Sequence, residues 1–258
     1  MVFNSVFLNC FLHMGSGMTK PAGVSTNSDA FTWIGSTGGW WGLATNWQDT
    51  TTGQNPATTA PGSKNAVTIA GATGLAYEVI RGGGAAARVG LTNQIDLVGT
   101  YTFGALTVGS ETLVPKGAAA FVPGNLMLGS GSALTLGALD LLDGQMTVGA
   151  GTSVTASGAV SLGQSAQAGV PTGGSTTGSS AAASGALTVS GGGVFTASGS
   201  LSVVDGSLTV DGAGSAVSVG GNMQLGAAAT STGTRSSSAS SGTVTLTNGA
   251  RLSVAGSV

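Results

Sequence analysis

Four tryptophans lie close together near the start of the chain, at Trp33, Trp40, Trp41 and Trp47. An exposed indole ring can stack on the apolar face of a sugar ring, so the cluster is a candidate for binding glycans. A buried indole instead contributes a large apolar area, so the same residues fit a hydrophobic plug over the end of a core. Of these two interpretations we favour the plug.

The carboxylates offer a second candidate chemistry, because enzymes that cleave polysaccharides need two or three of them converging on one face, often with Ca²⁺. Asp140 and Asp143 are close in sequence, and Asp143 and Asp205 occupy equivalent positions at the ends of two similar segments. The segment between them ends in Gly163, so we expect this column of carboxylates to be broken. Asp143-Gly, Asp205-Gly and Asp211-Gly are typical turn dipeptides, and we expect turn roles for all three Asp residues.

Other reactive groups are scarce. The chain has one Cys and one His, which excludes a disulfide framework and a Cys/His zinc site. No Ser or Cys nucleophile has a partner base in the sequence. The glycine runs at 82–84 and 191–193 are not followed by the Lys and helix that a phosphate loop requires. We therefore predict no catalytic residue, no metal site, no cofactor and no enzymatic activity.

Composition narrows the fold class. Only 6% of the 258 residues are charged, against about 25% in ordinary domains, and the net charge is −2. So few basic residues cannot neutralise a run of phosphates, which argues against a nucleic-acid partner. Hydrophobic residues at 41% argue against disorder, and the 47 Gly residues follow no three-residue period. The composition indicates an all-β chain with short strands and many turns.

The most regular feature is a repeat of about 20 residues in the C-terminal part of the chain. Six segments, here called units, each begin with an apolar-x-apolar triplet. The leading aliphatic residues are Leu106, Leu126, Met146, Leu187, Leu208 and Val244. Their spacings are 20, 20, 41, 21 and 36 residues. Insertions rich in Ser, Thr and Gly, at 164–185 and 227–242, account for the two long intervals.

Each unit contains two or three such triplets separated by turn-forming residues, which is the pattern of short strands. Stacking equivalent triplets gives parallel sheets around a narrow aliphatic core. We therefore predict a right-handed parallel β-helix, or β-solenoid, with rungs of about 20 residues. Backbone groups at an uncapped end of such a stack remain open to pairing.

The predicted organisation has four parts. Residues 1–30 form a poorly structured leader or a mis-called start, because the apolar opening is too short to span a bilayer. Residues 31–65 form a Trp-rich N-terminal cap, and 66–104 form irregular first rungs. Residues 105–258 form the regular repeats and end short of a complete unit, so we expect an open C-terminal rung that continues in a longer protein or self-associates.

The N-terminal segment resembles the start of bacterial autotransporter-type passenger proteins built of β-strand repeats. The matching positions are Phe31, Trp33, Trp41, Asn46, Trp47, Pro61, Gly62, Val67 and Ile69. The runs at 190–203 and 241–254 are similar to the repeats of these proteins, so the resemblance covers about residues 31–258.

This resemblance implies a secreted or surface-displayed parallel β-helix with a structural or adhesive role, held at the outer membrane by a region outside this chain. The expected partners are host or cell-surface glycans or proteins, or a second copy met at the open C-terminal rung. We expect no integral membrane segment in the chain itself. A polysaccharide-acting β-helix enzyme, or a glycan-binding module using the Trp cluster, is the alternative.

Overall fold

The computed structural model describes residues 28–70, 78–113, 119–165, 167–169, 182–232, 235–237 and 239–258. The leader predicted over 1–30 lies almost wholly outside these residues, as does much of the insertion predicted at 164–185. The only helix in the described part is the single 3-10 turn η1 (Ala44–Asn46). The prediction of an all-β chain is therefore confirmed.

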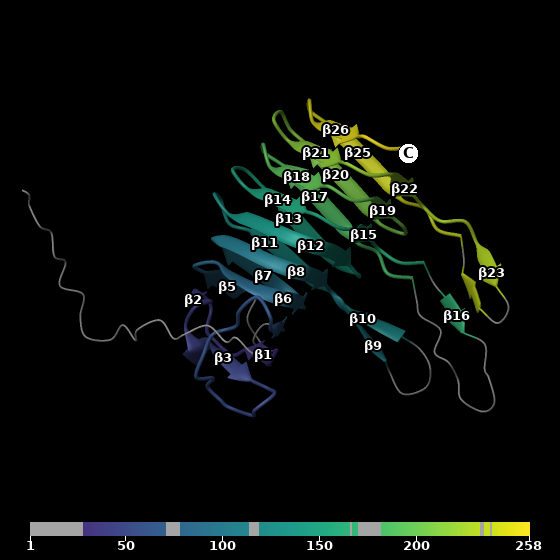
Figure 1. Cartoon of the computed structure of the whole chain (residues 1–258). Helices are drawn as coiled ribbons and strands as arrows, with labels where there is room; N and C mark the ends of the chain where they lie inside the picture. Colours follow the sequence, from purple (N-terminus) through teal and green to yellow (C-terminus); the bar gives the residue numbers. More distant parts are fainter. Residues whose placement is uncertain are drawn as a thin grey trace, which may run out of the picture.

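Most strands belong to two large sheets whose members stack along the molecule in Figure 1. In spatial order the eight-stranded sheet contains β2 (Gly39–Trp40), β5 (Glu78–Arg81), β7 (Asn93–Val98), β11 (Gly124–Leu128), β13 (Gly144–Val148), β17 (Ala186–Ser190), β20 (Ser207–Asp211) and β25 (Thr243–Thr247). Every pairing within this sheet is parallel.

The thirteen-stranded sheet is parallel except at one end, where β1 (Ala30–Trp33) pairs antiparallel with β3 (Trp47–Asp49). Next to β1 lie β4 (Ala66–Ile69), β6 (Gly84–Leu91), β8 (Thr100–Val108) and β12 (Ala133–Leu141). The sheet forks at β12. One branch contains β14 (Ser153–Ala156), β18 (Val194–Ala197), β21 (Ala216–Val219) and β26 (Arg251–Val254), and the other contains β15 (Val160–Leu162), β19 (Leu201–Val203) and β22 (Met223–Leu225).

From β7 onward the chain alternates regularly between the two sheets. Each unit begins with one strand of the eight-stranded sheet and continues into the thirteen-stranded sheet. Leading residues pair directly with their equivalents in the next unit, in the order Ile95, Leu126, Met146, Leu187, Leu208 and Val244. The predicted repeat register is thus confirmed from Leu126 onward.

The register predicted for the first repeat is wrong. Leu106 lies in β8 and pairs with Leu139 of β12, so it belongs to the thirteen-stranded sheet. On the side toward the start of the chain, Leu126 pairs with Ile95, and on the other side it pairs with Met146. The triplets in both sheets have the same apolar-x-apolar pattern, so the sequence does not show which sheet a triplet enters. The segment between β8 and β11 also places Leu126 20 residues after Leu106, which matches the repeat length.

Alternate residues of both sheets point into one continuous apolar cluster that runs from Phe31 to Met223. The buried positions follow the pairing register, as in the column Tyr101, Leu134, Val154, Phe195 and Val217. Val244, Leu252 and Val254 are only partly buried at its far end. The side chains between these positions point outward and are mostly Thr, Ser, Gly or amides.

Three excursions, here called arms, leave the stack after β8, β15 and β22 (Figure 1). The first contains the hairpin of β9 (Ser110–Leu113) and β10 (Ala119–Val122). The second contains β16 (Gln167–Gly169), and the third contains β23 (Thr230–Thr232) and β24 (Arg235–Ser237). β16 pairs with β24, so the second and third arms join in one small antiparallel sheet. The first arm was not predicted as an insertion.

A column of glycines lies where the chain turns between the two parts of the thirteen-stranded sheet. A Cβ atom on Gly104 would lie 2.3 Å from the Ala87 carbonyl oxygen, and one on Gly137 would lie 2.1 Å from that of Gly104. Gly158 meets the Gly137 carbonyl in the same way, at 2.4 Å. Only glycine therefore allows successive units to approach closely enough at this corner.

Replacing Gly137 by Ala should lower the free energy of unfolding by about 1 to 3 kcal/mol, because the added Cβ forces adjacent backbones apart. Gly149→Ala is the matched control, since a Cβ there meets nothing within 4 Å, and it should change stability by less than about 0.5 kcal/mol. Urea unfolding followed by circular dichroism measures both. Equal midpoints for the two variants would contradict the close approach.

Candidate functional site

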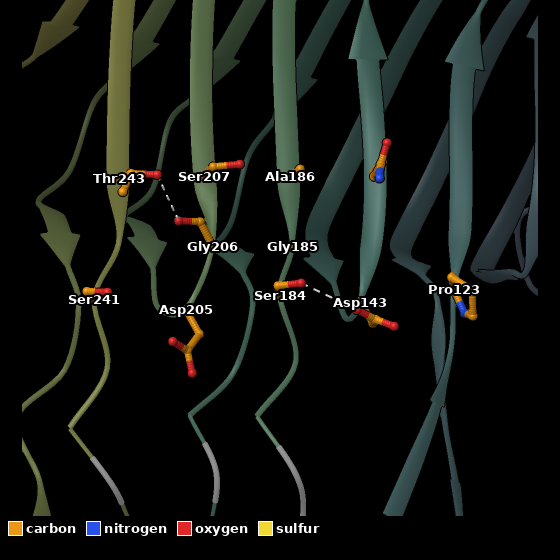
Figure 2. Close-up of a pocket in the computed structure, with 11 residues that line it drawn as sticks. Pro123, Asp143, Ser184, Gly185, Ala186, Asp205, Gly206, Ser207, Ser241 and Thr243 are labelled. Carbon is orange, nitrogen blue, oxygen red and sulfur yellow. Dashed lines mark hydrogen bonds between the residues drawn. The ribbon is translucent and has the colours of Figure 1, made fainter.

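A surface corner lies where the chain enters the eight-stranded sheet. Five successive strands of that sheet each start at a glycine or directly after one. The residues that stand before these glycines are Pro123, Asp143, Ser184, Asp205 and Ser241. Figure 2 shows these five residues side by side, one for each of the strands β11, β13, β17, β20 and β25. The glycines keep the backbones at this corner close together, since a Cβ on Gly144 would lie 2.2 Å from the Val108 carbonyl oxygen and one on Gly206 would lie 2.4 Å from that of Leu162.

Along this corner, arms alternate with tight turns. Pro123, Ser184 and Ser241 follow the three arms, whereas Asp143 and Asp205 follow strands of the thirteen-stranded sheet after only a short connection. Both Asp residues have positive φ, 53° for Asp143 and 55° for Asp205. Asp tolerates this conformation better than most residues do, so the turn role predicted for them is confirmed.

The predicted break in the carboxylate column lies elsewhere than expected. Gly163 precedes the second arm and does not stand between the two Asp residues in this column. Ser184, the residue that ends that arm, occupies the position, and its hydroxyl donates a hydrogen bond to Asp143 Oδ1 at 3.4 Å. The sequence signal that could have found the whole column is the Pro-Gly, Asp-Gly or Ser-Gly pair before each leading triplet.

These residues line a hollow of about 440 Å³ at the foot of the arms, seen in Figure 2. Its upper wall is formed by the first outward side chains of the strands: Gln145, Ala186, Ser207 and Thr243. A second hollow of about 240 Å³ shares Pro123, Asp143 and Gln145 with it and adds Asn93 and Asn125. We call the two together the corner groove.

Oxygen acceptors dominate the chemistry of the corner groove. Among the described residues that line it, the polar side chains are carboxylates, amides and hydroxyls, Pro123 and Ala186 are apolar, and none is Lys, Arg or His. Asn125 Oδ1 is buried and accepts no hydrogen bond, which leaves one desolvated acceptor at the narrower end. The groove therefore suits a ligand that donates hydrogen bonds and carries no negative charge.

The four tryptophans do not share one environment. Trp33, Trp41 and Trp47 are 6%, 2% and 0% exposed, whereas Trp40 is 55% exposed. Trp40 lies on β2 opposite Arg81, with its ring directly over Gly82. Only Trp40 among the four therefore offers an open ring face to a sugar.

The three buried indoles form a connected aromatic cluster at the antiparallel end of the core. The Trp47 ring lies 4.8 Å from those of both Trp33 and Trp41, edge to face, and Trp41 reaches Tyr101 and Phe103 at 5.6 Å. Each indole N–H is satisfied, with Trp33 Nε1 donating to Glu78 Oε1 at 2.5 Å. Edge-to-face packing with satisfied N–H groups is the arrangement expected of aromatic residues in a core.

The remaining strand carboxylates are dispersed. Asp140 points outward from β12 between Thr107 and Ser161, and Asp96 lies on β7 beside Met127. Burial raises the pKa of both groups, and for Asp96 the positive charge of Arg81 opposes this shift. Neither residue lines the corner groove, so within the described residues only Asp143 and Asp205 are brought together there.

No group of three or more His, Cys, Asp and Glu side chains gathers as a metal site among the residues that the structure describes. In the same residues, no helix has the length and apolar character needed to cross a membrane. Comparison of the chain with protein-family models, with curated proteins and with solved structures gave no match. Any functional inference must therefore start from the geometry itself.

Acrylamide quenching of Trp fluorescence should act almost entirely on Trp40. The other three indoles are buried, so Trp40→Phe should remove the quenchable, red-shifted part of the emission and leave a blue-shifted, protected signal. The conservative variant keeps an aromatic ring on β2 and is not expected to alter the fold. Strong quenching that persists in Trp40→Phe would contradict the burial of the other three.

Hydrogen bonds to Asp211 predict a small acid-dependent contribution to stability. Thr247 Oγ1 and Asn248 Nδ2 donate to Asp211 Oδ1 at 2.6 and 2.7 Å, and these bonds lower the pKa of the carboxyl from its ordinary 3.8. The contribution is therefore present above pH 3.8 and is lost as the pH falls through the lowered pKa. Thr247→Val should raise the Asp211 pKa toward its ordinary value, as measured by carboxyl carbon chemical shifts. An unchanged titration would contradict this assignment.

Proposed function

We propose that the chain is part of an extracellular surface protein of autotransporter-passenger type, with a structural or adhesin-like role and no enzymatic activity. The observation that carries the proposal is the in-register parallel pairing of successive units in both sheets around one core. In this proposal the two sheets are faces of a single right-handed parallel β-helix, with rungs of about 20 residues between arms.

Several features suit such a role. Each unit contacts mainly its neighbours, so the stack behaves as a stiff spacer whose length grows with the number of units. The exterior consists largely of hydroxyls, amides and glycine with few charges. The antiparallel strand β3 and the aromatic cluster act as the proposed N-terminal cap of residues 31–65.

Adhesion would be carried by the arms and the surfaces beside them, since they project from the stack (Figure 1). Glycans or proteins of a host or neighbouring cell are the proposed partners. Pairing between β16 and β24 holds two arms together, so they would present one continuous surface.

The exposed Trp40 supports a second candidate, a glycan-binding module. Its ring lies beside the exposed Arg81, and Asp96 is near enough to interact electrostatically with that guanidinium. An aromatic face flanked by charged hydrogen-bonding groups is a common arrangement for holding one sugar ring. A glycan-binding module of this kind would use Trp40 and none of the other three tryptophans.

A hydrolytic role for the Asp143 and Asp205 pair is less well supported. Glycoside hydrolysis needs one carboxyl group kept protonated, which enzymes achieve with an apolar pocket. Around the two Asp side chains the described groove lining is mostly hydroxyls, glycines and the Gln145 amide, and its apolar side chains are Pro123 and Ala186. We therefore propose binding without cleavage.

Immunolabelling of the organism that encodes the chain tests the proposed location. Antibodies raised against the purified chain should label intact cells, and Fab fragments from them should reduce attachment of those cells to a surface if the role is adhesive. Antibodies to a cytoplasmic protein are the control and should label permeabilised cells only. If the chain is likewise detected only after permeabilisation, the proposal is wrong.

A further inference from the structure

We infer that the corner groove binds a linear, uncharged β-1,4-linked glycan that lies along the stacking direction, across the starts of β11, β13, β17, β20 and β25. This inference deepens the adhesin-like role proposed above by naming a ligand class and a site. It concerns the purified chain, so it can be tested separately from the location of the protein on a cell.

The corner groove is continuous across several units. Its two hollows share Asp143, Gln145 and Pro123 and together extend from Asn93 to Thr243. Such a groove crosses several units, with the arms on one side and the outward strand residues on the other (Figure 2). A small molecule would occupy only part of it, whereas a chain polymer could follow its length.

The spacing of the two carboxylates in the groove also favours a β-1,4-linked glycan. Asp143 and Asp205 are two strands apart, with Ser184 between them, so their backbone positions are separated by about 9.6 Å, twice the ordinary strand spacing. In a β-1,4-linked glycan alternate rings are flipped, and equivalent hydroxyls recur every second ring at a similar interval. An extended peptide repeats its side-chain direction every two residues, or about 6.7 Å, and would fall out of step.

The chemistry of the groove also favours a sugar ligand. Sugar hydroxyls donate hydrogen bonds, and the groove provides carboxylate oxygens at Asp143 and Asp205 and hydroxyl oxygens of Ser and Thr beside them. Hydrogen bonds to charged acceptors are stronger than those between neutral groups. Two carboxylates, with no Lys, Arg or His among the lining residues that the structure describes, disfavour sulfated, phosphorylated or uronic-acid polymers.

The left-handed backbone at Asp143 and Asp205 allows a clean test. Asn tolerates positive φ as well as Asp does, so Asp143→Asn with Asp205→Asn removes both charges without disturbing the turns. Ala186→Trp is an independent variant that fills the groove from an outward strand position. Asp211→Asn is the matched control, because it removes the same charge from the other end of β20, outside the groove.

Binding of hexasaccharides of β-1,4-linked glucose, xylose and N-acetylglucosamine should be measured by titration calorimetry and by ligand-observed NMR. We expect at least one hexasaccharide to bind the unaltered chain without being cleaved. The Asp143→Asn, Asp205→Asn double variant should bind about tenfold more weakly or worse, from the loss of two charge-assisted hydrogen bonds. Ala186→Trp should abolish binding, and Asp211→Asn should leave it unchanged. A disaccharide should bind much more weakly than the hexasaccharide.

Three results would overturn the inference. The first is absence of binding to all three hexasaccharides at millimolar concentration. The second is binding that is lost in Trp40→Ala but retained in both groove variants, which would place the sugar on the exposed indole. The third is stronger binding to a uronic-acid hexamer than to the neutral ones, since Asp143 and Asp205 would repel its carboxylates. Circular dichroism of each variant verifies that the sheets are intact.

Discussion

Backbone hydrogen bonding between successive units is the constraint on which the other features depend. Parallel strands exchange these bonds only when equivalent residues lie directly beside one another, and a slip of one residue would turn each apolar side chain outward. The buried apolar columns of both sheets follow from that register. So do the glycine corners, where the bonds draw adjacent backbones too close for a side chain.

The sequence was sufficient to predict strand type, the leading triplets from Leu126 onward and two of the three arms. It did not place Leu106, because period-two triplets look alike whichever sheet they enter, and the arm between β8 and β11 happens to restore the spacing. Burial of most of the Trp cluster was also predictable from apolar area. The exposure of Trp40 was not, since it depends on β2 lying at the end of the eight-stranded sheet with Gly82 beneath the ring.

The corner groove was predictable only in part. Asp143-Gly and Asp205-Gly are recognisable turns, but their neighbour Ser184 is more than twenty residues from the Gly163 that seemed to occupy its place. What brings these residues together is the return of each arm to the position from which the next strand must start. The length of an arm does not reveal where the arm rejoins the sheet. The glycine required at the corner does reveal this position.

The alternation of arms and tight turns limits how a molecule of this kind can change in length. A hairpin arm contains two strands side by side and is therefore about 9.6 Å wide. Two stacked units extend the same distance along the stacking direction. Loss or duplication of the unit formed by β17, β18 and β19, which lies between the second and third arms, would change the spacing of these arms and break the pairing of β16 with β24. Gene rearrangements that preserve the arm surface should therefore add or remove units in pairs, so the natural module of duplication is a DNA segment that encodes two units.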